Sequence, residues 1–258
     1  MPFIDIRGAR LHYLEAGTGR PIVCFHSTPA SAAFYRPQLE HFGARYRVIA
    51  VDLRGHGDSD KPQGPYRMSA FLEDYVALFD ALDLREFVLV GCSVGGIIAQ
   101  LYALAHGANL KGLVLIGSPC SRRGRDVEAF RRAVREQGWE AVARGLVDKQ
   151  LHPATHPDVK AWALAEYLKT PLHVREAEEA ALLEEIHHTD RVHEITVPTL
   201  LVAGEAEERE IYEQMAFMSG RIPDAEWHVV AGAAHVPNFE RPAEFNAILS
   251  RYLARIGY

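Results

Sequence analysis

Residues 87–100 read Phe87-Val88-Leu89-Val90-Gly91-Cys92-Ser93-Val94-Gly95-Gly96-Ile97-Ile98-Ala99-Gln100. Four apolar residues at the start predict a buried parallel strand, and Gly-x-Ser-x-Gly follows at once. An apolar run of helical character then continues from Val94 to Ala105. Strand, tight turn and helix are the context in which this motif presents a nucleophilic serine, here Ser93. The alternative is a glycine-rich turn around a buried structural serine.

Size and composition narrow the class of protein. A chain of 258 residues with 48% hydrophobic side chains is long enough for one large α/β domain with an insertion. The net charge of −6 argues against general affinity for nucleic acid, which needs a basic surface. We therefore expect no nucleic-acid partner.

The start of the chain and the cysteines indicate a compartment. Residues 1–7 have neither the basic nor the apolar region of a secretory signal. No apolar run approaches the ~20 residues that span a membrane, so no membrane association is expected. Cys24, Cys92 and Cys120 lie in or beside expected strands, which is typical of free thiols in a reducing cytosol. The sequence therefore predicts a cytoplasmic protein.

Strands and helices alternate along most of the chain. The expected strands are 3–7, 10–15, 21–25, 47–51, 87–90, 113–116, 199–203 and 227–230. Helical spacing of apolar residues predicts a helix that ends near Phe42 and others over 69–84, 94–105, 208–219 and 242–256. Ser69 is the expected N-cap of the second of these. The alternation predicts an α/β fold with a mostly parallel eight-stranded sheet and helices on both faces.

The alternation stops at about Ser118. From residue 120 to residue 193 the pattern is helical, with breaks at glycines and prolines. An insertion of about 70 residues far exceeds an ordinary connection between a strand and a helix. We expect it to form a helical cap (lid) after the sixth strand. The predicted core domain comprises residues 1–119 and 194–258, and the predicted cap comprises residues 120–193.

A base for Ser93 is expected late in the chain. A serine hydroxyl is a poor nucleophile unless a base takes its proton, and a third group must orient that base. Sites built on this motif have the chain order Ser, then Asp or Glu, then His. His235 follows the last expected strand, so it falls at the carboxyl edge of the sheet, where Ser93 also emerges. We predict His235 as the base; the alternative is a solvated loop histidine.

The orienting acid is expected after the strand 199–203. The sequence there, Gly204-Glu205-Ala206-Glu207-Glu208, offers only glutamates. Spacing from Gly204 favours Glu207, and Glu205 and Glu208 remain open. Glutamates at the start of a helix are also what compensation of the helix dipole alone would produce.

Acyl chemistry needs donors for the developing oxyanion. The motif places one donor on the residue after the nucleophile, which is Val94, at a helix N-terminus. The second is expected in His26-Ser27-Thr28-Pro29, the loop after the third strand. The N–H of Thr28 is the best candidate, because Pro29 has no N–H. We predict an oxyanion hole formed by Thr28 and Val94.

Together these motifs resemble the α/β-hydrolase superfamily over essentially the whole chain. The matching segments are His26-Ser27-Thr28-Pro29, Asp52-Leu53-Arg54-Gly55-His56-Gly57-Asp58-Ser59, the Gly91–Gly95 motif, Gly232-Ala233-Ala234-His235 and Glu240-Arg241-Pro242-Ala243-Glu244-Phe245. Within the superfamily, the helix after Ser93 and residues 130–153 and 238–249 look most like 3-oxoadipate enol-lactonases and related small esterases.

The chain departs from the family pattern at two positions. The family's acid is usually Asp, whereas this chain offers Glu207. Ser27 stands where the family usually has Gly, and it puts a side chain beside the oxyanion hole, where it would influence substrate choice. The resemblance also implies that a set of polar residues mainly braces the loop beside the site instead of forming a second catalytic set: Asp52, Arg54, His56 and Asp58.

Substrate contacts are expected from the cap. Trp139, Trp162 and Tyr167, with Leu168, are predicted to line an apolar pocket. A basic cluster at the start of the cap would either bind a carboxylate or form a solvated helix face: Arg122, Arg123, Arg125, Arg131, Arg132 and Arg135. Residues 187–193 hold three histidines and an aspartate, but their spacing fits no metal site, and a solvated helix end is expected.

The leading hypothesis is a serine hydrolase that cleaves a small carboxylic ester or lactone through an acyl-enzyme. Ser93 would be the nucleophile, His235 the base and Glu207 the acid, with no metal and no organic cofactor. One alternative keeps the fold but hydrolyses a C–C bond or performs cofactor-free oxygenation. Another is a non-catalytic receptor for a small molecule. Assembly as a homodimer is left open.

Overall fold

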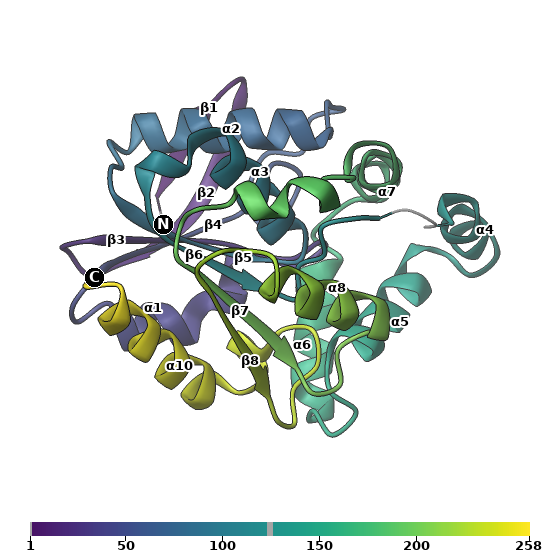
Figure 1. The fold of residues 1–258 in the computed structure, drawn as a ribbon. Coiled ribbons are helices and arrows are strands. Elements are labelled where there is room, and N and C mark those ends of the chain that lie inside the picture. The colour runs from purple at the N-terminus through teal and green to yellow at the C-terminus, as the bar shows by residue number, and fades with distance from the viewer. Residues whose placement is uncertain (1, 123–125) are drawn as a thin grey trace.

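The computed structural model describes residues 2–122 and 126–258, and its centre is a twisted β-sheet (Figure 1). The eight strands of this described part are β1 (Phe3–Ile6), β2 (Ala9–Ala16), β3 (Pro21–Phe25), β4 (Arg47–Val51), β5 (Phe87–Cys92), β6 (Leu110–Ile116), β7 (Thr199–Gly204) and β8 (Ala225–Val230). Their order across the sheet is β1-β2-β4-β3-β5-β6-β7-β8. The β1–β2 and β2–β4 pairs are antiparallel, and the pairs from β4 to β8 are parallel. The predicted fold class is confirmed.

Helices cover both faces of the sheet because its inner strands are apolar on both sides. The helices outside the insertion are α1 (Arg36–Phe42), α2 (Met68–Ala81), α3 (Val94–His106), α8 (Arg209–Ser219), α9 (Pro237–Glu240) and α10 (Pro242–Arg255). Phe87 and Leu89 of β5 join the apolar cluster that contains α2, α3 and α8. Val88 and Val90 join the cluster that contains α1 and α10. In Figure 1 the helices α2 and α3 lie on one side of the sheet and α1 and α10 on the other.

The strand β5, which leads directly to Ser93, is held in place by burial of its side chains. Phe87, Val88 and Leu89 are completely inaccessible to solvent. Each such side chain contributes roughly 1.5–3 kcal/mol to stability by leaving water. All three cysteines are free and buried, as the sequence predicts.

The start of α2 differs from the prediction. The helix begins at Met68, and Ser69 lies inside its first turn instead of capping it. The Ser69 N–H donates to Glu185 Oε2 of the insertion at 3.3 Å. A distant carboxylate therefore accepts from one of the free amides of the first turn, while Arg67 at the N-cap makes no side-chain capping bond.

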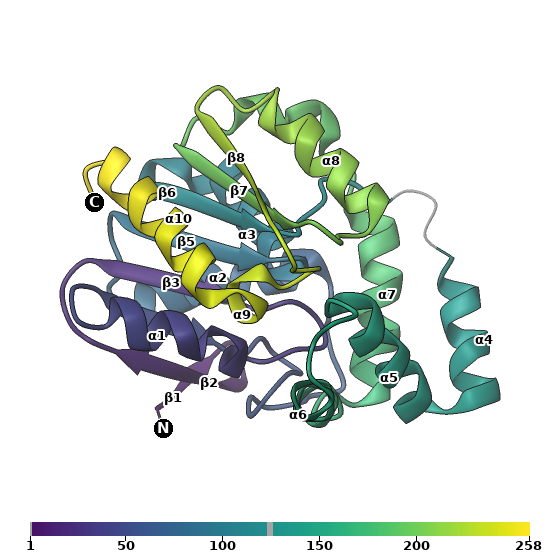
Figure 2. The same cartoon turned by 90° about the horizontal axis from the view of Figure 1, so that it is seen from below.

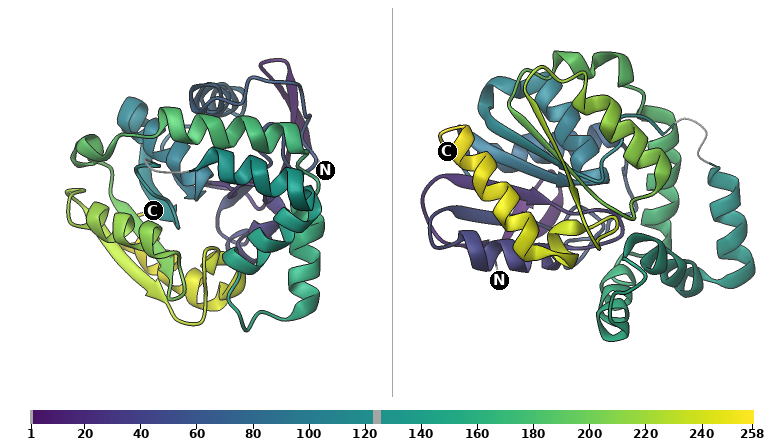
Figure 3. Two further views of the ribbon diagram at one scale, coloured as in Figure 1. Left: turned by 90° about the vertical axis from the view of Figure 1, so that its right-hand side faces the viewer. Right: turned by 60° about the horizontal axis from the view of Figure 1, so that its bottom comes forward.

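In the described part of the insertion between β6 and β7 the α-helices are α4 (Val127–Gln137), α5 (Trp139–Gln150), α6 (Pro157–Tyr167) and α7 (Leu172–Glu185). Figure 2 shows them gathered on one side of the molecule, and the right-hand view of Figure 3 repeats this arrangement in teal and green. An isolated antiparallel bridge between Ser121 and His187 joins the two ends of the insertion. Short 3₁₀ helices complete the described chain at Ala32–Tyr35, Gly107–Asn109 and Thr189–Glu194. No helix in the described ranges is long and apolar enough to cross a bilayer.

The histidine-rich segment after α7 is less exposed than its sequence suggests. His187 is exposed, but only 5% of His188 is accessible to solvent. His188 Nε2 lies 2.9 Å from Gln100 Oε1 on α3. Because an amide oxygen can only accept, His188 Nε2 is the donor. The expectation of a fully solvated helix end is therefore wrong for His188, because the end of the insertion packs back onto α3.

Two buried histidines are held in their neutral form. Burial lowers the pKa of His188 to about 4. Burial, followed by the nearby His56, lowers the pKa of His26 to about 4 as well. His26 is fixed by two backbone contacts, since Nδ1 donates to Ser27 O (2.8 Å) and Nε2 accepts from Leu53 N–H (3.0 Å).

We predict that mild acid destabilises the fold through these histidines. A histidine with a lower pKa in the folded than in the unfolded state binds fewer protons when folded, so acid favours unfolding. Stability should be complete above pH ~6.5 and fall as the pH drops toward ~4, by roughly 3 kcal/mol for each site. Urea unfolding at several pH values measures this slope.

His188→Gln should flatten part of that pH dependence, because glutamine keeps a donor for Gln100 and does not titrate. His41→Gln, at an exposed position, is the matched control and should keep the wild-type slope. An unchanged slope in His188→Gln would contradict the assignment.

Candidate active site

Ser93 occupies the tight turn between β5 and α3. Its backbone has φ 50° and ψ −114°, which is costly for a residue with a side chain. Two hydrogen bonds of 2.8 Å hold the turn, from Ser93 N–H to Ile116 O and from Ile97 N–H to Ser93 O. Gly95 is needed because a Cβ there would lie 2.5 Å from Phe25 O on β3. The motif therefore has the strand–turn–helix geometry that presents a serine side chain.

Glu207 and His235 form a buried pair beside this turn. His235 lies in the loop after β8, and its Nδ1 is 3.0 Å from both carboxylate oxygens of Glu207, which follows β7. The His235 side chain is only 6% exposed and the Glu207 side chain only 1% exposed. A carboxylate can only accept, so Nδ1 carries the proton and Nε2 is left as an acceptor.

The two rival glutamates have other partners. Glu205 Oε2 accepts from Gly232 N–H at 2.9 Å. Glu208 Oε1 pairs with Lys149 Nζ of α5 at 3.0 Å. Of the three candidates, only Glu207 has a hydrogen bond with His235 in the described structure. The geometry thus favours the choice that spacing suggested.

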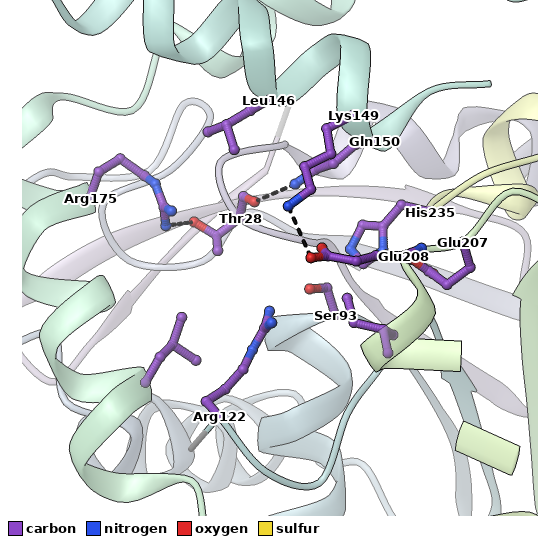
Figure 4. Close-up of a pocket in the computed structure, with 12 residues that line it drawn as sticks. Thr28, Ser93, Arg122, Leu146, Lys149, Gln150, Arg175, Glu207, Glu208 and His235 are labelled. Carbon is purple, nitrogen blue, oxygen red and sulfur yellow. Dashed lines mark hydrogen bonds and ion pairs between the residues drawn. The ribbon is translucent and has the colours of Figure 1, made fainter. Parts of the chain in front are cut away.

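A pocket brings these groups together under the insertion. Figure 4 shows the Ser93 and His235 side chains reaching this pocket, with Lys149 and Gln150 opposite them. The described residues that line it are Thr28, Ser93, Arg122, Leu146, Lys149, Gln150, Arg175, Leu182, Glu207, Glu208, Ile211 and His235. A reacting atom in this space would have a hydroxyl, an imidazole and an apolar wall within reach.

Of the two predicted oxyanion donors, Thr28 is among the described residues that line this pocket and Val94 is not. Thr28 belongs to residues 26–31, here called the oxyanion loop, and it lines the pocket directly. Val94 is the first residue of α3, so its N–H has no acceptor within the helix. Within the described chain, the Thr28 N–H donates to no protein acceptor either. Both amides are therefore available to a ligand, although their role in catalysis stays a prediction.

Tyr167 and Ser27 were predicted to contact substrate, but neither is among the described residues that line this pocket. Tyr167 is fully buried, and its hydroxyl donates to Gln150 Oε1. Ser27 is 1% exposed within the oxyanion loop. Both side chains therefore lie behind residues that face the pocket.

The two cap tryptophans are also placed away from the described pocket lining. Trp139 Nε1 donates to Thr170 O at 3.1 Å. Trp162 stacks on Phe239, with ring centroids 5.1 Å apart. Leu168 is 38% exposed at the surface. Helical spacing marks apolar faces but does not say which of them a helix turns toward the nucleophile.

Gln150 is a pocket residue that sequence reasoning missed. Its backbone oxygen accepts from His235 N–H at 3.0 Å, and its Nε2 donates to Thr28 O at 3.4 Å. The end of α5 therefore joins the loop that holds His235 to the oxyanion loop. No local signal distinguishes this glutamine from a surface residue, because its contacts are all with distant segments.

The arginines of the basic cluster at the start of the insertion do not all lie in the same place. Arg122 lines the pocket, which agrees with a binding role. Arg123 and Arg125 lie outside the described residues. The remaining members sit on α4: Arg131, Arg132 and Arg135.

The polar segment after β4 braces the oxyanion loop. Asp52 is buried and accepts from Ala32 N–H (2.6 Å), Asp58 N–H (2.9 Å) and His12 Nδ1 (2.6 Å). Burial would raise the pKa of Asp52, but these hydrogen bonds outweigh it and keep the pKa below its usual value. His12, Asp52 and Asp58 are also the one group of metal-ligating types that comes together among the described residues. Since Asp52 already has three donors, we assign the group a structural role.

Two further members of this segment have different partners. Arg54 forms a bidentate pair with Asp74 of α2, with distances of 2.7 and 2.8 Å. His56 instead contacts Thr28 Oγ1 at 2.9 Å through Nε2. Arg54 thus anchors the segment to α2, whereas His56 touches the pocket wall.

Comparison with known families now places the chain. Residues 20–242 match the family described as alpha/beta hydrolase fold. The chain belongs to this family, and the protein is a hydrolase.

Particular relatives sharpen the comparison. The chain is 28% identical over 254 residues to 3-oxoadipate enol-lactonase 2 of Acinetobacter baylyi, covering 95% of this chain and 93% of that protein. A thermophilic esterase from Thermogutta terrifontis has a similar structure, with a TM-score of 0.91, 26% identity and 99% of each chain covered. Est816, described as an N-acyl homoserine lactone degrading enzyme, has a TM-score of 0.84 and 29% identity, covering 96% of this chain and 99% of that one. The resemblance to lactonases and small esterases is confirmed.

Replacement of the acid should reduce turnover. We expect Glu207→Gln to lower kcat by about 10²–10⁴-fold, because glutamine neither stabilises the imidazolium nor fixes the tautomer as a carboxylate does. Steady-state kinetics with an activated ester measures this. Glu205→Gln is the matched control and should stay within about twofold of wild type; equal losses in the two variants would refute the assignment.

Gly117 offers a steric test of the same pair. A Cβ at this position, where φ is +51°, would lie 2.7 Å from Glu207 Oε2 and 2.9 Å from His235 Nδ1. Gly117→Ala should therefore displace the pair and lower kcat at least ~10-fold, since a shift of about 1 Å in an active site can cost ~10²-fold. Gly145→Ala on α5, where a Cβ meets nothing within 4 Å, should leave kcat unchanged.

Proposed function

We propose that this protein hydrolyses small carboxylic esters or lactones through an acyl-enzyme on Ser93. The observation that carries the proposal is the buried Glu207–His235 pair, with 3.0 Å from Nδ1 to each carboxylate oxygen, in the pocket that Ser93 lines. This arrangement leaves Nε2 of His235 to take the proton of the serine hydroxyl.

In the first half of the reaction, Ser93 Oγ attacks the carbonyl carbon while His235 accepts the hydroxyl proton. The carbonyl oxygen becomes an oxyanion, for which the Thr28 and Val94 amides are the proposed donors. Collapse of this intermediate breaks the bond to the leaving oxygen, which takes the proton from His235. For a linear ester the alcohol departs; for a lactone it stays attached to the acyl group.

In the second half, water attacks the acyl-enzyme. His235 removes a proton from the water, and the new tetrahedral intermediate expels Ser93 Oγ, which recovers its proton from the imidazolium. The acid product then leaves. Each proton passes between Ser93, His235, water and the leaving oxygen, and Glu207 stabilises the positive imidazolium throughout.

The pocket and the relatives support esters or lactones as substrates. Leu146, Leu182 and Ile211 provide an apolar surface for the carbon skeleton of an acyl or alkyl group. The relatives described above include an enol-lactonase, an esterase and a lactone-degrading enzyme. Both observations favour this substrate class over a C–C bond or molecular oxygen.

Labelling and turnover test the proposal together. A fluorophosphonate should add one mass increment per chain at Ser93, and p-nitrophenyl acetate should be hydrolysed. Ser93→Ala should lose labelling and at least ~10⁴-fold of kcat, because nucleophile and base act as a unit. Ser121→Ala, outside the described pocket lining, is the matched control.

The rival functions give other results. Consumption of O₂ that persists in Ser93→Ala, without ester hydrolysis, would indicate oxygen chemistry driven by His235. Cleavage of a β-diketone without cleavage of activated esters would indicate C–C hydrolysis. A protein that is neither labelled nor active on any ester would be a receptor, and the proposal would be rejected.

A further inference from the structure

Side chains of the insertion hold the oxyanion loop at several points. Ser31 Oγ donates to Glu166 Oε2 of α6 at 2.6 Å. Thr170 Oγ1, between α6 and α7, donates to Pro29 O at 3.2 Å. Together with Gln150 of α5, these contacts join the loop to three parts of the insertion. The position of the loop therefore depends on how the insertion is docked.

The strongest of these attachments is at the Thr28 hydroxyl. It accepts from Arg175 Nη1 of α7 at 2.6 Å and donates to Glu178 Oε2 at 2.7 Å. His56 Nε2 also lies 2.9 Å from this oxygen. The hydroxyl therefore contacts three side chains at once, and two of them come from α7. Figure 4 shows the Arg175 guanidinium reaching Thr28 across the pocket.

The charged groups around Thr28 are buried. Arg175 is 2% exposed and Glu178 is completely inaccessible. Arg175 Nη1 also donates to Glu178 Oε2 at 2.6 Å, and Nη2 donates to Glu179. Burial would raise the pKa of Glu178, but His56, Arg175 and the Thr28 hydroxyl outweigh it and hold the pKa at about 2. Charges paired in this way tolerate few alternative arrangements, because any unpaired member would stay buried.

The hydroxyl and the amide of Thr28 belong to one residue and are separated only by Cα and Cβ. A group that fixes Oγ1 therefore also limits where the N–H can lie. An oxyanion donor must lie about 2.7–3.1 Å from the oxygen that develops charge, so small displacements weaken the transition state. The buried side chains of Arg175 and Glu178 on α7 thus limit the position of the Thr28 amide in the core.

We propose that Arg175 and Glu178 are positioning residues, which act through the Thr28 hydroxyl to place the Thr28 amide for the oxyanion. The inference rests on the proposed function, since it needs an acyl-transfer reaction at Ser93. It gives the insertion a second task besides covering the substrate: docking of α7 completes the oxyanion hole.

The central experiment uses Thr28→Val. Valine keeps the shape and the backbone N–H of threonine but removes the hydroxyl that Arg175 and Glu178 hold. We expect kcat for p-nitrophenyl acetate to fall about 10- to 100-fold, with KM within about threefold of wild type. Thr28→Ser, which restores a hydroxyl, should lose clearly less kcat than Thr28→Val.

A double-mutant cycle tests whether the two sides act through each other. Arg175→Gln alone should also lower kcat, and Arg175→Gln combined with Thr28→Val should be little worse than the more impaired single variant. Arg144→Gln is the matched control, because Arg144 forms an exposed pair with Glu140 on α5 at 3.1 Å. It should keep wild-type kcat and KM. Circular dichroism and urea unfolding establish that each variant is folded.

The outcomes separate this inference from the proposed function. Thr28→Val with kcat within threefold of wild type, or with a change confined to KM, would overturn the positioning role. This conclusion holds even if Arg175→Gln fails to fold, because Thr28→Val adds no unpaired charge. Full activity in Ser93→Ala would instead defeat the proposed function, whatever the Thr28 variants do.

Discussion

The turn at Ser93 is the constraint on which the rest of the site depends. The serine holds φ 50° only because β5, β3 and α3 pack closely enough to exclude a side chain at Gly95. The stability gained by burying the inner parallel strands, such as β5, offsets this local strain. Once the turn is fixed, Ser93 lines the pocket and α3 begins at the next residue. Every other active-site group has to be brought to that point.

Two loops that follow neighbouring strands supply the partners. β7 and β8 are parallel and adjacent, so Glu207 and His235 leave the sheet at the same edge and meet at the pocket. Their pairing in a nearly solvent-free setting strengthens the interaction of carboxylate and imidazole. Gly117, after β6, leaves the room that this pair requires. The residues of the proposed reaction thus lie at the ends of strands, which suits a reaction that needs fixed geometry.

Polar contacts join the insertion to the oxyanion loop. Its contacts with the oxyanion loop are mostly hydrogen bonds from buried polar side chains, and a buried ion network connects α7 to Thr28. Apolar packing alone would allow several similar arrangements of a helix on a surface, whereas buried charges accept few. Gln150 adds a direct connection between the loop that holds His235 and the oxyanion loop. The core and the insertion therefore share one polar framework.

The sequence by itself determined the alternation of strands and helices, the Ser93 turn, the order of Ser93, a glutamate and His235, and the position of the insertion. Each of these follows from spacing between near neighbours or from a local motif, because strand and helix periods act over a few residues. Only the tertiary structure showed that Glu207 and not Glu205 meets His235, that Tyr167 lies behind Gln150, and that His188 is buried. It also revealed the contact between Thr28 and Arg175, which are 147 residues apart. Such contacts depend on how whole elements dock, and no local pattern records which face of a helix will meet which loop.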